Sequence, residues 1–340
     1  MDTPNISLRE KRERFENEYL SPYAAKSADS KGRKEPISPC DVRTDYQRDR
    51  DRITHSKSFR RLMHKTQVFI APEGDHYRTR LTHTLEVAQI ARTISRALCL
   101  NEDLTEAIAL GHDLGHTPFG HTGEEALDNL WPEGFSHNEQ SIRVCEVIER
   151  DGKGLNLTLE VLDGILNHRG SCDPHTLEGK VVQISDKIAY INHDIDDAIR
   201  ADLLREEDLP KGCTDILGKL GTVRIDFLIR DVINSSMEKN DIIMTPTVRK
   251  AMYDLRQHMY ETVYTGQLQM KERRKISRVL EELYYHYTDR KNAMPEEFMK
   301  IVDRGESYER AALDYVACMT DRFAIKQYTN IFMPASWAVY

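Results

Sequence analysis

Apolar residues recur every three or four positions along almost all of this 340-residue chain, and convincing alternation with a period of two is hard to find. Because a 3.6-residue period places apolar side chains on one face of a helix, the pattern predicts an all-α protein. One such apolar stripe runs from Leu81 to Leu100. Further helices are expected from about Leu104 to Leu114, from Leu177 to Ile199, and over roughly 220–239, 246–264 and 308–329.

Capping signals predict where some of these helices begin and end. Gly115 is suited to the left-handed conformation that ends many helices. Thr122-Gly-Glu-Glu125 and Ser136-His-Asn-Glu139 both have the form of a capping box, and each predicts the start of a helix. A short loop that holds His116 and His121 is therefore expected before the first of these two helices.

Composition excludes several classes of protein. The chain is 39% hydrophobic and 31% charged, and it lacks an apolar run near the about 20 residues that span a bilayer. Its first twenty residues are charged throughout and carry no secretory signal, and the six cysteines form no CxxC pair. The net charge of −8 argues against general coating of nucleic acid. We therefore expect a cytoplasmic protein with no membrane partner.

Six of the thirteen histidines lie in less than a fifth of the chain, at His76, His83, His112, His116, His121 and His137. A metal site would explain this clustering, because imidazole nitrogen and carboxylate oxygen are ligands that divalent transition metals accept. His83, the His112-Asp113 pair and Asp186 would supply two nitrogens and two oxygens from three helices.

A single histidine on an amphipathic helix is more often an ordinary hydrogen-bonded residue than a metal ligand. The His112-Asp113 pair differs, because it follows an apolar run and would be costly to bury without a compensating cation. On the predicted helix from Leu177, the side chains of Asp186, Tyr190 and Asp194 share one side. The chain contains no GxxxxGK loop, so a P-loop nucleotidase is unsupported.

The order His83, His112-Asp113 and Asp186 resembles the H…HD…D signature of the HD-domain phosphohydrolases. The surrounding segments resemble successive motifs of the deoxyguanosine triphosphate triphosphohydrolases, namely RDRDRITHSKSFRRLMHKTQVF, RTRLTHTLEV, GHDLGHTPFGHTGEEAL, FSHNEQS, ISDKIAYINHDIDD and, more weakly, DYVACMTDRFA. The resemblance implies an HD-domain helical bundle with additional C-terminal helices. It would comprise a partly flexible N-terminal extension (1–40), a catalytic core (41–210) and a C-terminal helical region packed on the core (211–340).

The resemblance also implies a role for each matching residue. The metal ligands would be His83, His112, Asp113 and Asp186. The catalytic pair would be His121 and Glu124. The substrate-binding residues would be His116 and His137 in the phosphate channel, Arg80, Lys187, Tyr190 and Asp194 around the triphosphate and sugar, and Gln67 with Val68 at the deoxyribose.

By the same resemblance, the cofactor is a divalent metal ion (Mg, Mn, Fe, Ni or Co) and the substrate is a deoxynucleoside triphosphate (dNTP), with dGTP favoured. Homo-oligomers with an allosteric dNTP are expected, and single-stranded DNA stays open as a ligand. Two alternatives also remain open. One is an HD-domain hydrolase of a nucleoside monophosphate, cyclic nucleotide or guanosine polyphosphate. The other is a nucleotide-sensing or nucleic-acid-binding regulator, against which the complete set of ligand and catalytic residues speaks.

Overall fold

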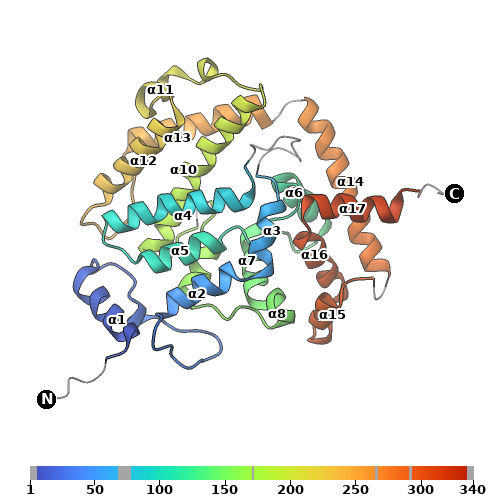
Figure 1. Cartoon of the computed structure of the whole chain (residues 1–340). Coiled ribbons are helices and arrows are strands. Elements are labelled where there is room, and N and C mark those ends of the chain that lie inside the picture. The colour runs from blue at the N-terminus through green and yellow to red at the C-terminus, as the bar shows by residue number, and fades with distance from the viewer. Residues whose placement is uncertain (1–5, 68–77, 171, 265–266, 291–292, 335–340) are drawn as a thin grey trace, which may run out of the picture. The chain divides into compact units, whose positions relative to one another are not determined.

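The computed structural model describes residues 6–67, 78–170, 172–264, 267–290 and 293–334 (Figure 1). Within these ranges the regular secondary structure is helical, and the only β-type pairings are two isolated bridges, Arg33 with Thr158 and Thr66 with Thr79. The prediction of an all-α protein is therefore confirmed. Among the described helices, none is both long and apolar enough to cross a membrane.

The chain divides into two compact units. The first unit comprises Met1–Ser56, Thr82–His112 and Leu155–Thr265, and the second comprises Lys57–Leu81, Asp113–Gly154 and Gly266–Tyr340. Each unit is thus assembled from segments far apart in the sequence. The predicted three-part division follows the sequence order instead, and it stays a prediction.

In the first unit, helices α5 and α10 are central. Helix α5 packs against α2, α9 and α10, while α10 also packs against α9, α12 and α13. Leu104, Ile108, Val181 and Ile188 are fully buried between these helices. The helices of this unit are α1 (Leu8–Tyr19), α2 (Asp45–Thr54), α4 (Arg80–Ala97), α5 (Glu102–Gly111), α9 (Leu159–Leu166), α10 (Leu177–Arg200), α11 (Lys211–Leu217), α12 (Gly221–Ser236) and α13 (Pro246–Met259). Short helical turns add η1 (Ser27–Asp29), η4 (Glu206–Asp208) and η5 (Tyr260–Tyr264).

In the second unit, the long helix α14 packs against α6, α16 and α17, and α15 packs against α8 and α16. Leu127, Leu280, Leu283 and Val316 are fully buried here. The helices of this unit are α3 (Lys57–Arg61), α6 (Gly120–Leu130), α7 (His137–Arg143), α8 (Glu149–Gly152), α14 (Gln267–Asp289), α15 (Glu296–Asp303), α16 (Tyr308–Cys318) and α17 (Asp321–Phe332), with turns η2 (Leu62–His64) and η3 (Val144–Ile148). The first two residues of α4 also belong to this unit.

The predicted role of Gly115 as a left-handed cap is wrong. Helix α5 ends at Gly111, before the expected Leu114, and the φ of Gly115 is not positive. A Cβ on Gly115 would lie 2.1 Å from the backbone nitrogen of Ser141 and 2.4 Å from the carbonyl carbon of Gln140. Glycine is therefore needed at this position for the close approach of the α7 backbone.

The start of α6 also differs from the prediction. The helix begins at Gly120, after Phe119 in the left-handed conformation (φ 62°, ψ 25°), so Thr122 lies in its first turn and does not cap it. His121 consequently lies on the helix and not in the loop before it. The predicted start of α7 is confirmed, with Ser136 as its N-cap.

The helix expected over 308–329 is two helices. Met319 and Thr320 adopt extended backbone conformations between α16 and α17, and the hydroxyl of Thr320 accepts a hydrogen bond from the backbone N–H of Phe323. A local threonine cap thus begins a second helix, although the apolar periodicity continues through the break.

Candidate active site

Three predicted metal ligands meet in the first unit. His83 lies in the first turn of α4, His112 directly follows α5, and Asp186 lies in the middle of α10. Asp186 Oδ1 is 3.1 Å from His83 Nε2 and 3.8 Å from His112 Nε2. The two imidazole rings are 5.7 Å apart between their centres. The packing of α5 on α10 thus brings His112 to Asp186.

The chemistry of these donors fits a divalent metal ion. Both imidazoles are almost fully buried. His112 Nδ1 lies 2.7 Å from the carbonyl oxygen of Ala109 and donates to it, which leaves Nε2 as the nitrogen that faces Asp186. Burial raises the pKa of Asp186, but the hydrogen bond with His83 and the charge of His112 outweigh burial, so the pKa lies well below its usual value. An ionised carboxylate beside two imidazoles is a donor set that divalent transition metals accept.

Two further histidines lie at this cluster, and sequence motifs assigned neither of them a role in the site. His168 packs its ring against that of His112, with 5.1 Å between centres. His193 Nδ1 lies 3.2 Å from His83 Nδ1, and its Nε2 lies 2.9 Å from a carboxylate oxygen of Glu86. The spacing of His193, seven residues after Asp186 on α10, was the signal that could have indicated its place beside the cluster.

A second cluster is centred on Glu124 of α6. Its carboxylate accepts hydrogen bonds from His121 Nδ1 at 3.3 Å, from His137 Nδ1 at 2.9 Å and from the backbone N–H of His137 at 3.0 Å. Burial raises the pKa of Glu124, but the bonds from the two histidines outweigh it, and the pKa lies well below its usual range. An ionised, buried carboxylate thus orients His121, whose side chain is 53% exposed.

Arg80, Asp113 and His116 adjoin this second cluster. Arg80 Nη1 donates to a carboxylate oxygen of Asp113 at 2.8 Å, and Nη2 lies 3.4 Å from the carbonyl oxygen of Gln67. His116 stacks on His137 with 4.6 Å between ring centres. Burial and the positive charge of Arg80 lower the pKa of His116 well below its usual value, so this ring is neutral at pH 7. Ligand atoms of Asp113, His116 and His137 lie within 4.8 Å of one another.

Lys65 has a supporting position that the sequence did not reveal. Its side chain is buried, and Nζ donates to the carbonyl oxygens of His116 and Ala317. Burial lowers the pKa of Lys65 to about 8. Asp321 has a comparable role, since its carboxylate accepts from Thr66 and from the backbone N–H of Phe119. The weak C-terminal motif therefore fixes the segment that leads into α6.

The remaining predicted binding residues lie on α10, except for Val68, which is outside the described residues. Asp194 is buried and Tyr190 is partly exposed. Lys187 Nζ donates to the carbonyl oxygen of Gly170 at 3.3 Å. Burial lowers the pKa of Lys187, and the positive charges of Arg256 and Arg249 on α13 lower it further. These two arginines are cations near the predicted site that sequence motifs did not indicate.

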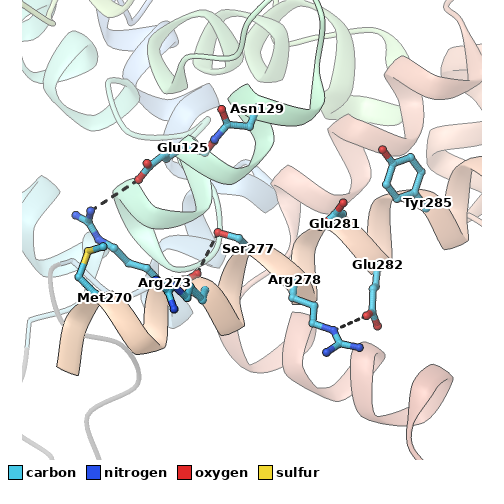
Figure 2. A pocket seen from close by; sticks show the side chains of 10 residues that line it. Glu125, Asn129, Met270, Arg273, Ser277, Arg278, Glu281, Glu282 and Tyr285 are labelled. Carbon is cyan, nitrogen blue, oxygen red and sulfur yellow. Dashed lines mark hydrogen bonds and ion pairs between the residues drawn. The ribbon is translucent and has the colours of Figure 1, made fainter. Parts of the chain in front are cut away.

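The second unit also has an open pocket of about 650 Å³ between α6 and α14 (Figure 2). Charges of both signs line it, and they pair locally, Arg273 with Glu125 at 3.9 Å and Arg278 with Glu282 at 2.7 Å. The lining residues are Glu125, Asn129, Met270, Arg273, Arg274, Ser277, Arg278, Glu281, Glu282 and Tyr285. None of them is a predicted site residue.

Two family models match the chain. The HD domain matches residues 80–191, the segment that contains His83, His112, Asp113 and Asp186. The phosphohydrolase-associated domain matches residues 242–330, which cover α13 to α16 and most of α17. The chain is therefore an HD-domain protein over the segment that carries both clusters.

Relatives match over nearly the full length. A deoxyguanosinetriphosphate triphosphohydrolase-like protein of Caldanaerobacter subterraneus is 61% identical over 98% of each chain. One of Clostridium tetani is 49% identical over 98% of this chain and 99% of its own. A solved phosphohydrolase structure from Bacteroides thetaiotaomicron has a TM-score of 0.53 at 18% identity, covers 83% of this chain and 68% of its own, and supports the fold alone. By these similarities the chain belongs to the family of deoxyguanosinetriphosphate triphosphohydrolase-like proteins, within the HD-domain phosphohydrolases.

Proposed function

We propose that this protein is a metal-dependent dNTP triphosphohydrolase, which converts a dNTP, with dGTP favoured, into a deoxynucleoside and tripolyphosphate. The observation that carries the proposal is the carboxylate of Glu124, which is bonded to both His121 and His137. It gives an exposed histidine a fixed orientation, as a proton donor requires. The names of the relatives support dGTP as the favoured substrate.

The proposed metal ligands are His83, His112, Asp113 and Asp186. His83, His112 and Asp186 cluster within the first unit, and Asp113 follows His112 directly in the sequence. A divalent ion (Mg, Mn, Fe, Ni or Co) supplies positive charge when bound, which offsets part of the about four negative charges of a triphosphate.

The proposed substrate contacts follow from the chemistry of each side chain. Arg80 and Lys187 provide cations for the phosphate oxygens. His116, neutral and stacked on His137, provides a hydrogen-bond donor or acceptor in place of a charge. Tyr190 and Asp194 contact the sugar or the triphosphate, and Gln67 contacts the deoxyribose together with Val68.

His121 is the proposed general acid. Water attacks the α-phosphorus, the bond between this phosphorus and the 5′ oxygen breaks, and His121 gives its proton to that oxygen as the deoxynucleoside leaves. Glu124 holds His121 through Nδ1, so Nε2 is the atom that transfers the proton. The whole triphosphate leaves as tripolyphosphate in one step.

Hydrolysis in water labelled with ¹⁸O tests which bond breaks. Mass spectrometry should find the label on a terminal phosphate of tripolyphosphate, and the deoxynucleoside should remain unlabelled. A deoxynucleoside diphosphate or monophosphate as the first product would contradict the proposal. Label on the hydroxyl of the nucleoside would place the attack at carbon and would contradict it as well.

The proposal extends to a cytoplasmic homo-oligomer that binds an allosteric dNTP, with single-stranded DNA as a further candidate ligand. Assays with each dNTP alone and with mixtures of the four test the regulatory part. Hydrolysis only in mixtures would support activation by a second nucleotide, and equal rates alone and in mixtures would contradict it.

A further inference from the structure

A series of hydrogen-bonded side chains within the first unit connects His83 to other residues of α4 and α10. His83 Nε2 faces Asp186 Oδ1 at 3.1 Å, while its other ring nitrogen, Nδ1, lies 3.2 Å from His193 Nδ1. His193 Nε2 lies 2.9 Å from a carboxylate oxygen of Glu86. Glu86 follows His83 by three residues on α4, and His193 follows Asp186 by seven on α10. Each of the two helices therefore carries two of these four hydrogen-bonded residues on one face.

The chemistry of Glu86 determines which atom donates and which accepts in each of these hydrogen bonds. Its carboxylate only accepts, so the Nε2–H of His193 donates to it. A neutral His193 then carries its lone pair on Nδ1, which accepts the Nδ1–H of His83.

A neutral His83 is left with its lone pair on Nε2, the atom that faces Asp186. A proton holds Nε2 and the Asp186 oxygen together in the 3.1 Å hydrogen bond between them, and a metal ion can take the place of that proton. The tautomer that Glu86 and His193 impose is thus the one in which Nε2 can bind a metal ion.

We propose that Glu86 and His193 are positioning residues that fix the tautomer and the ring orientation of His83 for metal binding. The inference rests on the metal site of the proposed function. A metal-binding imidazole commonly donates its other N–H to a hydrogen-bond acceptor. Loss of that acceptor lowers metal affinity about 10- to 100-fold. Glu86 and His193 act through His83 and are not ligands themselves.

The test compares two variants of His193 in the full-length protein, His193→Leu and His193→Asn. Isothermal titration with Mn²⁺ should show a loss of affinity of about 10- to 100-fold for His193→Leu. His193→Asn should stay within about threefold of the wild type, because its amide oxygen takes the position of Nδ1 and can accept the Nδ1–H of His83. His175→Leu is the matched control, since this histidine also pairs with a carboxylate, Asp163, but its side chain is 75% exposed.

A second variant and a second measurement keep the test decisive if a His193 variant does not fold. Glu86→Leu replaces a side chain that is 38% exposed, and it should weaken Mn²⁺ binding up to about tenfold. ¹⁵N spectra of the histidines in the Mg²⁺-loaded wild type should show His83 protonated at Nδ1 and not at Nε2. Thermal melts establish which variants fold.

The outcomes distinguish the positioning role of Glu86 and His193 from the metal site itself. Wild-type affinity in His193→Leu, or an equal loss in the leucine and asparagine variants, would overturn the positioning role while leaving the proposed hydrolase intact. A wild type that binds no Mn²⁺ would overturn the metal site and, with it, the role of Glu86 and His193. His83 protonated at Nε2 in the metal-loaded protein would also contradict the inference.

Discussion

At the scale of single residues, His121 differs from the histidines around it in its exposure to solvent. Its side chain is 53% exposed, whereas His137, bonded to the same carboxylate of Glu124, is buried. A group that gives a proton to the substrate must be accessible, and a group that only orients its neighbour can be buried. The contrast favours His121 over His137 as the acid.

His121→Ala should therefore lower kcat about 10²- to 10⁴-fold, the usual contribution of a general acid. Metal content and substrate affinity should stay close to those of the wild type, because His121 is not among the proposed ligands. Steady-state kinetics and elemental analysis check both expectations. A loss that appears only in KM would make His121 a phosphate-binding residue instead.

Gln67 has an acceptor atom that favours a role in sugar recognition. Its side chain is 6% exposed, and within the described part of the chain no group donates a hydrogen bond to its buried Oε1. An acceptor left in this state costs about 1–3 kcal/mol, and a sugar hydroxyl could satisfy it. Bonded to the 3′-hydroxyl, Gln67 would hold the deoxyribose in a slot too tight for a 2′-hydroxyl, so Gln67→Ala should lower the preference for dGTP over GTP.

The ratio of kcat/KM for the two nucleotides measures that preference. Gln257→Ala is the control, because Gln257 is exposed and bonds Glu261 on the surface. Equal losses on dGTP and GTP in the Gln67 variant would make Gln67 a positional residue without influence on the sugar.

Sequence predicted some of these residues and not others for a physical reason. His112-Asp113 stands out because an ionisable pair after an apolar run has no role in helix stability. The spacing of His193 from Asp186 places both on one face of α10, but the position of His193 beside His83 depends on how α4 meets α10. Local sequence patterns do not predict contacts between helices that are distant in the sequence.

At the scale of secondary-structure elements, apolar periodicity predicted where the helices lie, but it did not predict where several of them begin or end. The residues at these ends respond to neighbours from other elements. Gly115 avoids the α7 backbone, and Phe119 takes a left-handed conformation while its N–H donates to Asp321 of α17 at 3.0 Å. Capping rules describe only the local chain, so they could not indicate either constraint.

Gly115→Ala should destabilise the protein by at least about 2 kcal/mol, because the added Cβ would overlap backbone atoms of Gln140 and Ser141 that cannot rotate away. Gly212→Ala is the matched control. Its Cβ would enter open space within α11, where alanine gains up to about 1 kcal/mol over glycine. Urea unfolding of both variants checks the contrast, and a wild-type midpoint for Gly115→Ala would contradict it.

At the scale of the whole molecule, the two units divide the predicted site residues. His83, His112, Asp186, Lys187, Tyr190 and Asp194 belong to the first unit, and Gln67, Arg80, Asp113, His116, His121, Glu124 and His137 to the second. The unit boundary passes between His112 and Asp113, inside the most informative motif of the sequence. Sequence motifs predict which residues form the site, but periodicity carries no information on how distant segments assemble into units.

Metal binding should stabilise the native protein, because the proposed ligands come together only when the chain is folded. An ion at 100 times its Kd adds about 2.7 kcal/mol, so removal of metal by a chelator should lower the Tm by roughly 5 °C. Re-addition of Mn²⁺ should restore the Tm. Scanning calorimetry of the wild type before and after chelation measures the shift.

Asp186→Asn and Asp113→Asn should each abolish turnover and make the Tm insensitive to metal, since a site of four ligands would lose a charged oxygen donor. Asp163→Asn is the control for a carboxylate outside the cluster, because Asp163 pairs with the exposed His175. Elemental analysis after dialysis separates loss of metal from loss of chemistry. If both site variants retain stoichiometric metal, Asp113 and Asp186 are not its ligands, and other donors of the protein must hold the ion.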